Sequence, residues 1–168
     1  GNLTINTAGV KLKDTTVTGN LYLTGGVGLG NVELENVNVL GKIIVCGSGE
    51  AERGEHSIIL RNVTAPVLEI DSLAGQFLSV QADGLTDIGT TTVRTSAYLE
   101  DLTEDGLGLQ NIRLDGDPEF EGGVQLQLAG NIKDVINLTP NSGLQMAQGV
   151  AKQITVDEAA LDSTLTID

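Results

Sequence analysis

The amino-acid sequence predicts an all-β protein, a single-domain right-handed parallel β-helix that spans residues 1–168. Three observations support this fold: an internal sequence repeat, a two-residue alternation of apolar side chains within each copy, and the composition. The chain has 22 glycines, 2 tyrosines, 2 phenylalanines and no tryptophan. Its core must therefore be built from Val, Leu, Ile and Thr, which are mostly strand-favouring residues.

The repeat is clearest in the first half of the chain. Residues 32–45 match residues 10–23 at every apolar position and at the glycine, with an offset of 32 − 10 = 22 residues. A third copy, residues 58–70, follows with one residue deleted after Ala65. Weaker copies occupy residues 76–93, 97–114, 124–138 and 144–167. We therefore expect about seven to eight coils of roughly 22 residues.

Apolar residues alternate in short runs within each copy, as Val32 and Leu34, and then Ile43 and Val45, do. A period of two indicates strands that bury one face. Hairpins would need longer strands joined by tight turns. A leucine-rich repeat would need a helical half and a fixed Leu and Asn signature, which the sequence lacks. Short runs in a fixed order indicate a parallel solenoid.

Stacking of the copies predicts which side chains become neighbours. Lys11 should lie beside Glu33, and Lys13, Glu35 and Arg61 should form one outward column of alternating charge. Each opposite-charge pair favours this register by about 0.2–1 kcal/mol, whereas a slip by one residue would turn the apolar set outward.

A second column should stand at a corner of the coil. Asp14, Asn36 and Asn62 occupy the same position in successive copies. Asn and Asp tolerate left-handed backbone and can hydrogen-bond along the stack. We expect both columns to be structural.

Charge and composition exclude several classes of partner. The 9 Lys and Arg against 23 Asp and Glu give a net charge of −14, so nucleic acid and anionic membranes would be repelled. The sequence contains no apolar run long enough to cross a bilayer, and no direct membrane insertion is expected. The single cysteine, Cys46, cannot form an internal disulfide, and its apolar neighbours predict a small buried side chain.

Three segments carry a resemblance to known proteins: GNLTIN at residues 1–6, VKLKDTTVTGNLYLT at residues 10–24 and GNVELENV at residues 30–37. They resemble the β-helical segments of large exported surface proteins of Gram-positive bacteria (Firmicutes), which often carry S-layer homology modules. The likeness is closest over residues 1–110. Residues 47–56 are longer than the usual glycine turn, and residues 115–123 are unusually acidic.

The resemblance implies an extracellular location, associated with the cell wall or the S-layer. Such segments frequently accompany modules that bind or degrade polysaccharides. Strand-like residues run to both ends of the sequence, at residues 3–5 and 165–167. We therefore expect a module excised from a longer multimodular protein, whose flanking domains would be its partners.

Parallel β-helices include pectate lyases and polygalacturonases, but the sequence predicts no catalytic site. Hydrolysis needs a carboxylate pair with separated pKa values, and the strand-borne acids are Glu33, Glu35 and Glu69. The first two should face cations, which would keep their pKa values low. A lyase needs a base beside an acid cluster, and the positions of the lysines and arginines provide none. We expect a protein without enzymatic activity.

Carbohydrate contacts are expected at a small number of side chains. Tyr22 should point outward in the same column as Ile44 and Glu69, and Tyr98 is the other aromatic candidate. The polar segment at residues 47–56 contains Arg53 and the only histidine, His56, and it could equally be a solvated insertion. The candidate residues are Tyr22, Arg53, His56, Glu69 and Tyr98.

An acidic cluster suggests a metal site. Asp115, Asp117, Glu119 and Glu121 lie within seven residues, a density that suits Ca²⁺. The alternative is an acidic surface turn whose side chains extend into solvent.

The leading functional hypothesis is a non-catalytic extracellular module that binds plant or cell-wall polysaccharide within a multimodular surface protein. A structural spacer or surface-layer segment without a specific ligand is the alternative, and a polysaccharide lyase-like β-helix is the third hypothesis.

Overall fold

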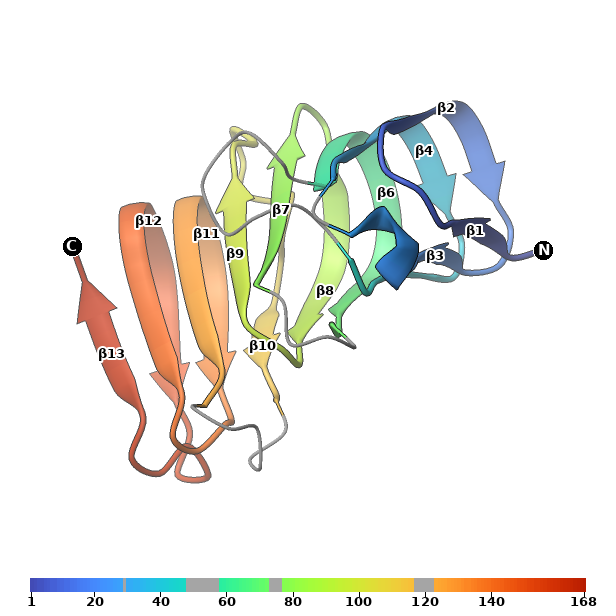
Figure 1. The fold of residues 1–168 in the computed structure, drawn as a ribbon. Helices are drawn as coiled ribbons and strands as arrows, with labels where there is room; N and C mark the ends of the chain where they lie inside the picture. The colour runs from blue at the N-terminus through green and yellow to red at the C-terminus, as the bar shows by residue number, and fades with distance from the viewer. Residues whose placement is uncertain (29, 48–57, 73–76, 117–122) are drawn as a thin grey trace.

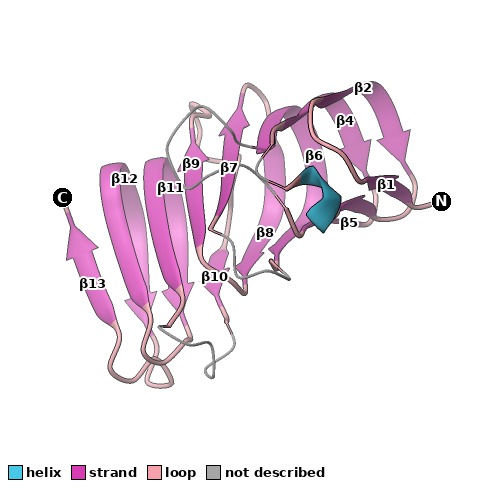
Figure 2. Cartoon of the chain, viewed as in Figure 1, coloured by secondary structure: helices cyan, strands magenta, loops and turns pink. Residues whose placement is uncertain are grey.

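A computed structural model describes residues 1–28, 30–47, 58–72, 77–116 and 123–168. The strands of this part of the chain wind into about seven stacked turns that form a β-solenoid, with the two ends of the chain at opposite ends of the stack (Figure 1). Every strand pairing in it is parallel. One short 3-10 helix, η1 (Gly25–Val27), interrupts the strands among the described residues (Figure 2). The prediction of an all-β solenoid is confirmed.

The strands follow one another along the chain and all join one sheet. They are β1 (Leu3–Ile5), β2 (Val10–Val17), β3 (Leu21–Leu23), β4 (Val32–Val39), β5 (Lys42–Val45), β6 (Ile58–Ile70), β7 (Leu78–Asp83), β8 (Asp87–Val93), β9 (Ala97–Asp101), β10 (Ile112–Leu114), β11 (Gln125–Asn137), β12 (Gly143–Val156) and β13 (Thr164–Ile167).

The strand pairings define three faces in the coils. Face A begins with residues 10–13 of β2 and continues through the start of β4 and β6, then β7, β9, the start of β11 and β12, and β13. Face B is short and includes residues 37–39 of β4. Face C contains β1, β3, β5, the ends of β6 and β8, β10, and the ends of β11 and β12.

The register of the first coils is the one that the sequence predicts. Lys11 pairs with Glu33. The deletion in the third copy is also visible. Asn38 pairs with Thr64, an offset of 64 − 38 = 26 residues, whereas Lys42 pairs with Val67, an offset of 67 − 42 = 25. One residue is therefore lost at the corner between faces B and C.

The later coils vary in length. Leu99 follows Val80 in the stack after 99 − 80 = 19 residues, and Leu128 follows Leu99 after 128 − 99 = 29. Strands are also longer than the short apolar runs suggest: β6 and β11 have 13 residues and β12 has 14. In these coils the backbone stays paired while it turns a corner, so strand pairing continues where the apolar alternation breaks.

Inward side chains stack into aliphatic columns. Val32, Ile58, Val80 and Leu99 follow one another in face A, and each is at most 1% exposed. Burial of such side chains contributes about 1.5–3 kcal/mol each. Stacking within these columns holds successive coils together.

The corner column of Asp14, Asn36 and Asn62 is confirmed. All three residues have left-handed backbone, with φ of 50°, 55° and 54°. The Asn36 amide donates a hydrogen bond to Asp14 Oδ1 at 2.8 Å, and the Asn62 amide donates to Asn36 Oδ1 at 3.0 Å. The column ends where the Leu85 N–H donates to Asn62 Oδ1 at 2.8 Å.

Asp101 interrupts an inward column of face A. It follows Leu60 and Ala82 in the stack and is fully buried. Its carboxylate accepts hydrogen bonds from the N–H groups of Thr103 and Leu109 at 2.9 and 2.8 Å, and from the Thr103 hydroxyl at 2.5 Å. The buried carboxylate thus satisfies backbone donors of the connection that follows β9.

Cys46 is only partly buried, so the prediction of a buried side chain was wrong in degree. The reason is the strand alternation: Val45 takes the inward position and is fully buried, and the next side chain turns outward. Burial still raises the pKa of the Cys46 thiol, and the negative charges of Asp71 and Glu69 raise it further.

Candidate functional site

Tyr22 and Glu69 lie on one outward column of face C, as the sequence predicts. Tyr22 pairs with Ile44 on the next strand, and Ile44 pairs with Glu69 on the one after it. All three side chains are partly exposed. The Tyr22 hydroxyl accepts a hydrogen bond from the Asn20 amide at 3.1 Å, which orients the ring. We call Tyr22, Ile44 and Glu69 the Tyr22 surface, which places an aromatic ring, an aliphatic chain and a carboxylate side by side.

Two cations flank Glu69. Lys42 Nζ lies 3.6 Å from one carboxylate oxygen and Arg94 Nε lies 3.6 Å from the other. Arg94 also lies 3.9 Å from the carboxylate of Asp115. The two cations orient the Glu69 carboxylate. Its side chain is 20% exposed, so the carboxylate still reaches the surface.

Arg113 extends the same column and was missed by the sequence reasoning. Glu69 pairs with Thr92, and Thr92 pairs with Arg113. Arg113 is exposed, and no described residue forms an ion pair with it. The sequence does indicate that Arg113 occupies an outward position equivalent to that of Tyr22, because residues 112–114 repeat the apolar-polar-apolar alternation of residues 21–23.

The prediction that Tyr98 is an exposed sugar-binding aromatic was wrong. Tyr98 is 6% exposed, between Ser79 and Gln127 on the neighbouring strands. Ser79 is 3% exposed and buried beside it. Surrounding atoms shield this stretch of face A, so the ring cannot present its face to a ligand.

The other candidate residues are divided between described and undescribed segments. Arg53, His56, Asp117, Glu119 and Glu121 lie outside the described residues. Asp115 is described, and its carboxylate lies near Arg94.

Metal binding therefore stays a prediction. Within residues 1–28, 30–47, 58–72, 77–116 and 123–168, no group of three or more His, Cys, Asp or Glu side chains is arranged to hold a metal ion. Three of the four acids of the predicted Ca²⁺ site are not among those residues.

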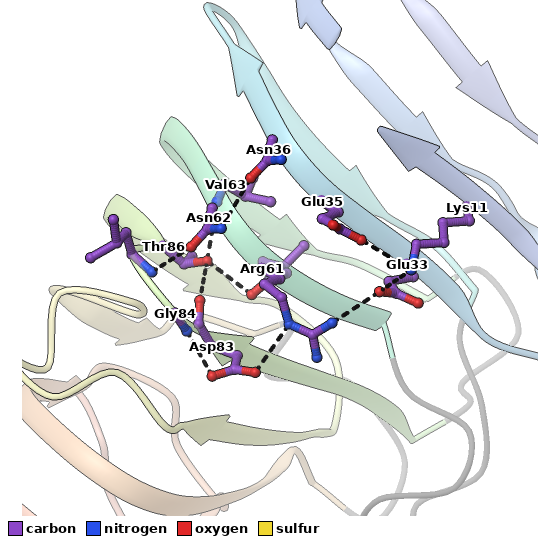
Figure 3. A network of polar contacts seen from close by, with 12 residues as sticks. Lys11, Glu33, Glu35, Asn36, Arg61, Asn62, Val63, Asp83, Gly84 and Thr86 are labelled. Atoms are coloured by element: carbon purple, nitrogen blue, oxygen red, sulfur yellow. Dashed lines mark hydrogen bonds and ion pairs between the residues drawn. The ribbon is translucent and has the colours of Figure 1, made fainter. Parts of the chain in front are cut away.

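Face A carries the predicted charged column (Figure 3). Lys11 Nζ lies 2.8 Å from Glu33 Oε1 and 3.0 Å from Glu35 Oε2, and Lys13 Nζ lies 3.1 Å from Glu35 Oε2. Hydrogen bonding to Lys11 and Lys13 holds the pKa of Glu35 below its ordinary value, and the same carboxylates raise the pKa of Lys11. Neither shift suits acid–base catalysis, which needs a group that titrates near neutral pH.

Arg61 continues this column toward the next coil. Its guanidinium donates to Glu33 Oε1 at 3.2 Å through Nη1 and to Asp83 Oδ2 at 3.3 Å through Nε (Figure 3). Asp83 in turn accepts a hydrogen bond from the N–H of Gly84 at 2.7 Å. The charged side chains of this half of face A are thus used in pairing one coil to the next.

Comparison with known protein families, with characterised proteins and with solved structures finds no match for this chain. No helix among the described residues is long and apolar enough to cross a membrane.

Proposed function

We propose that the protein is a non-catalytic extracellular module that binds plant or cell-wall polysaccharide as part of a multimodular surface protein. The observation that carries the proposal is the Tyr22 surface, where an outward aromatic ring shares a column with an oriented carboxylate. Sugar rings pack their apolar faces on aromatic side chains, and their hydroxyls bond to adjacent polar groups.

The proposed lack of catalysis is supported by the acids on the strands. Glu33, Glu35 and Glu69 each lie within 4 Å of at least one cation. Paired carboxylates of this kind are poor general acids near neutral pH. Location at the cell wall or S-layer is part of the same proposal and rests on the resemblance of the first coils.

Affinity electrophoresis and pull-down over soluble and insoluble glycans test the proposal. We expect retention on at least one polysaccharide, and we expect Tyr22→Ala to weaken it about tenfold, equivalent to about 1.4 kcal/mol. Tyr22→Phe should retain most of the affinity because it keeps the ring. Equal thermal stability of both variants would show that the loss comes from the surface and not from the fold.

A structural spacer is the second candidate, and the paired charges of face A favour it. The column from Lys11 to Asp83 links four successive strands on that face, which suits a stiff rod. Retention of the native protein on none of the glycans would contradict polysaccharide binding and support the spacer.

A further inference from the structure

The two halves of face A use their outward side chains differently. In the first half, the side chains of Lys11, Glu33, Arg61 and Asp83 bond to one another across coils. In the last three strands of face A, the start of β11, the start of β12 and β13, the outward positions carry uncharged amides and hydroxyls. They are Gln125 and Gln127 in β11, Gln145 in β12, and Thr164 and Thr166 in β13.

The register places these five side chains, which we call the amide surface, on adjacent strands. Gln127 pairs with Gln145, and Gln145 pairs with Thr166. Together with Leu126, Gly143 and Leu144, the amide surface lines a shallow groove of about 100 Å³. Leu126 and Leu144 are buried in the core, so the groove is lined by strand backbone and by hydrogen-bonding side chains.

Gly143 leaves room for the side-chain amide of Gln125 in this groove. A Cβ atom at Gly143 would stand 2.0 Å from Gln125 Oε1, so a larger residue would displace that side chain. The Gln125 amide therefore lies over the backbone of β12 at Gly143. Its side-chain amide carries both donors and an acceptor for hydrogen bonds.

Most of these polar groups have no partner within the described chain. The Gln145 amide donates to Asp168 Oδ2 at 2.7 Å. The side chains of Gln127, Thr164 and Thr166 form no hydrogen bond with any described residue. Unlike the charged side chains at the other end of face A, they are available to a ligand.

We propose that the amide surface binds a neutral polysaccharide chain. Amides and hydroxyls donate and accept hydrogen bonds, as sugar hydroxyls do, and the lining of the groove contains no charged side chain. The net charge of −14 disfavours polyuronates through long-range repulsion. The inference extends the ligand class of the proposed function to a second surface, separate from the Tyr22 surface.

Isothermal titration calorimetry of the full chain tests this inference. The probes are two soluble neutral glycans, mixed-linkage β-glucan and galactomannan, with polygalacturonate as the acidic comparison. We expect at least one neutral glycan to bind, with affinity nearly unchanged between low and high salt. Polygalacturonate should bind at least tenfold more weakly at low salt.

Matched glutamine variants locate the surface. Gln127→Ala should weaken binding of the neutral glycan at least fivefold. Gln153→Ala changes another exposed glutamine, on β12 but outside the amide surface, and should leave the affinity unchanged. Equal melting temperatures for the two variants would exclude unfolding as the cause.

The outcomes separate this inference from the proposed function. Absence of binding to both neutral glycans, or equal affinity of the Gln127→Ala variant and the native protein, would overturn the amide surface. If Tyr22→Ala alone reduced binding, the proposed function would stand and the second surface would be rejected. If Gln127→Ala alone reduced it, the ligand would bind at the amide surface and not at the Tyr22 surface.

Discussion

Thr91 places a hydroxyl inside an aliphatic column of face C. It stacks between Leu68 and Ile112 and is fully buried, and its Oγ1 has no hydrogen-bond partner among the described residues. Burying a hydroxyl without a partner costs about 1–3 kcal/mol. The position would suit a side chain of the same shape without the hydroxyl.

We therefore expect Thr91→Val to raise the free energy of unfolding by about 1 kcal/mol, because valine removes the unpaired hydroxyl and keeps the volume. Urea denaturation at neutral pH measures the change.

Thr86→Val is the matched control for that substitution. Thr86 is 1% exposed, donates to the carbonyl oxygen of Leu60 at 2.9 Å and accepts from the N–H of Val63 at 3.1 Å. Removal of its hydroxyl should destabilise the protein by about 1–3 kcal/mol. Equal loss of stability in both variants would show that Thr91 has a partner.

At the scale of the element, the corner column links β2, β4 and β6 through side chains as well as through backbone. Asn36 is its central member, with left-handed backbone and hydrogen bonds to both neighbours. Asn36→Ala should lower the free energy of unfolding by about 1–3 kcal/mol, because alanine in left-handed backbone costs about 1–2 kcal/mol and the column is broken. Thermal denaturation measures the loss.

Two comparisons separate the backbone contribution from the side-chain contribution. Asn36→Gly should cost less than Asn36→Ala, since glycine adopts left-handed backbone without strain. Asn38→Ala, at an exposed position of the same strand, should stay within about 0.5 kcal/mol of the native protein. If Asn36→Ala were as stable as Asn38→Ala, the column would contribute nothing.

The charged column should make face A sensitive to acid. Lys11 and Lys13 hold the folded-state pKa of Glu35 below its value in the unfolded chain. The resulting stabilisation is present above the unfolded-state pKa, near 4.5, and is lost as the pH falls through the lower folded-state pKa.

We expect Glu35→Gln to reduce the loss of stability between neutral pH and about pH 3. Melting temperatures across this range, with Glu158→Gln as a control at an exposed acid outside the column, test the expectation. An equal fall in melting temperature between neutral pH and about pH 3 for the native protein and the Glu35→Gln variant would contradict it.

For the whole molecule, the sequence predicted the fold best in the first three coils, where the copies of the repeat are clearest. Alternating apolar residues and stacked charges indicate the register that pairs Lys11 with Glu33 and Glu35 with Arg61. The same register brings Tyr22 and Glu69 onto one column. Alternation reports the side of the strand on which a residue lies, but not what covers that side. For this reason Tyr98 was misjudged.

The later coils were harder to predict because their lengths differ and a polar residue enters the core. Asp101 occupies a position where the preceding coils have Leu60 and Ala82. Its carboxylate accepts a hydrogen bond from the N–H of Leu109, eight residues further along the chain. The alternation of apolar residues does not reveal such a contact. The amide surface is not evident in the sequence for a related reason: Gln127 and Thr166 are 39 residues apart (166 − 127 = 39), and their alignment depends on pairings across three strands.

Because each coil contacts its immediate neighbours, stability should vary along the stack. We expect the amides of β6, which pairs with strands of the coils on both sides, to exchange hydrogen most slowly. Those of β1 and β13, which each pair with a single strand, should exchange fastest. Hydrogen–deuterium exchange with mass spectrometry measures this gradient, and uniform protection from β1 to β13 would contradict it.

The parallel stack also determines how the protein would respond to tension. Its backbone hydrogen bonds run between coils, along the axis that separates the two chain ends in Figure 1. A pull on the ends therefore loads these bonds lengthwise and opens them in succession, as a zipper does, instead of shearing a whole strand at once. Each released coil of roughly 22 residues would lengthen the chain by about 70–80 Å. The protein would therefore unfold one coil at a time at low force.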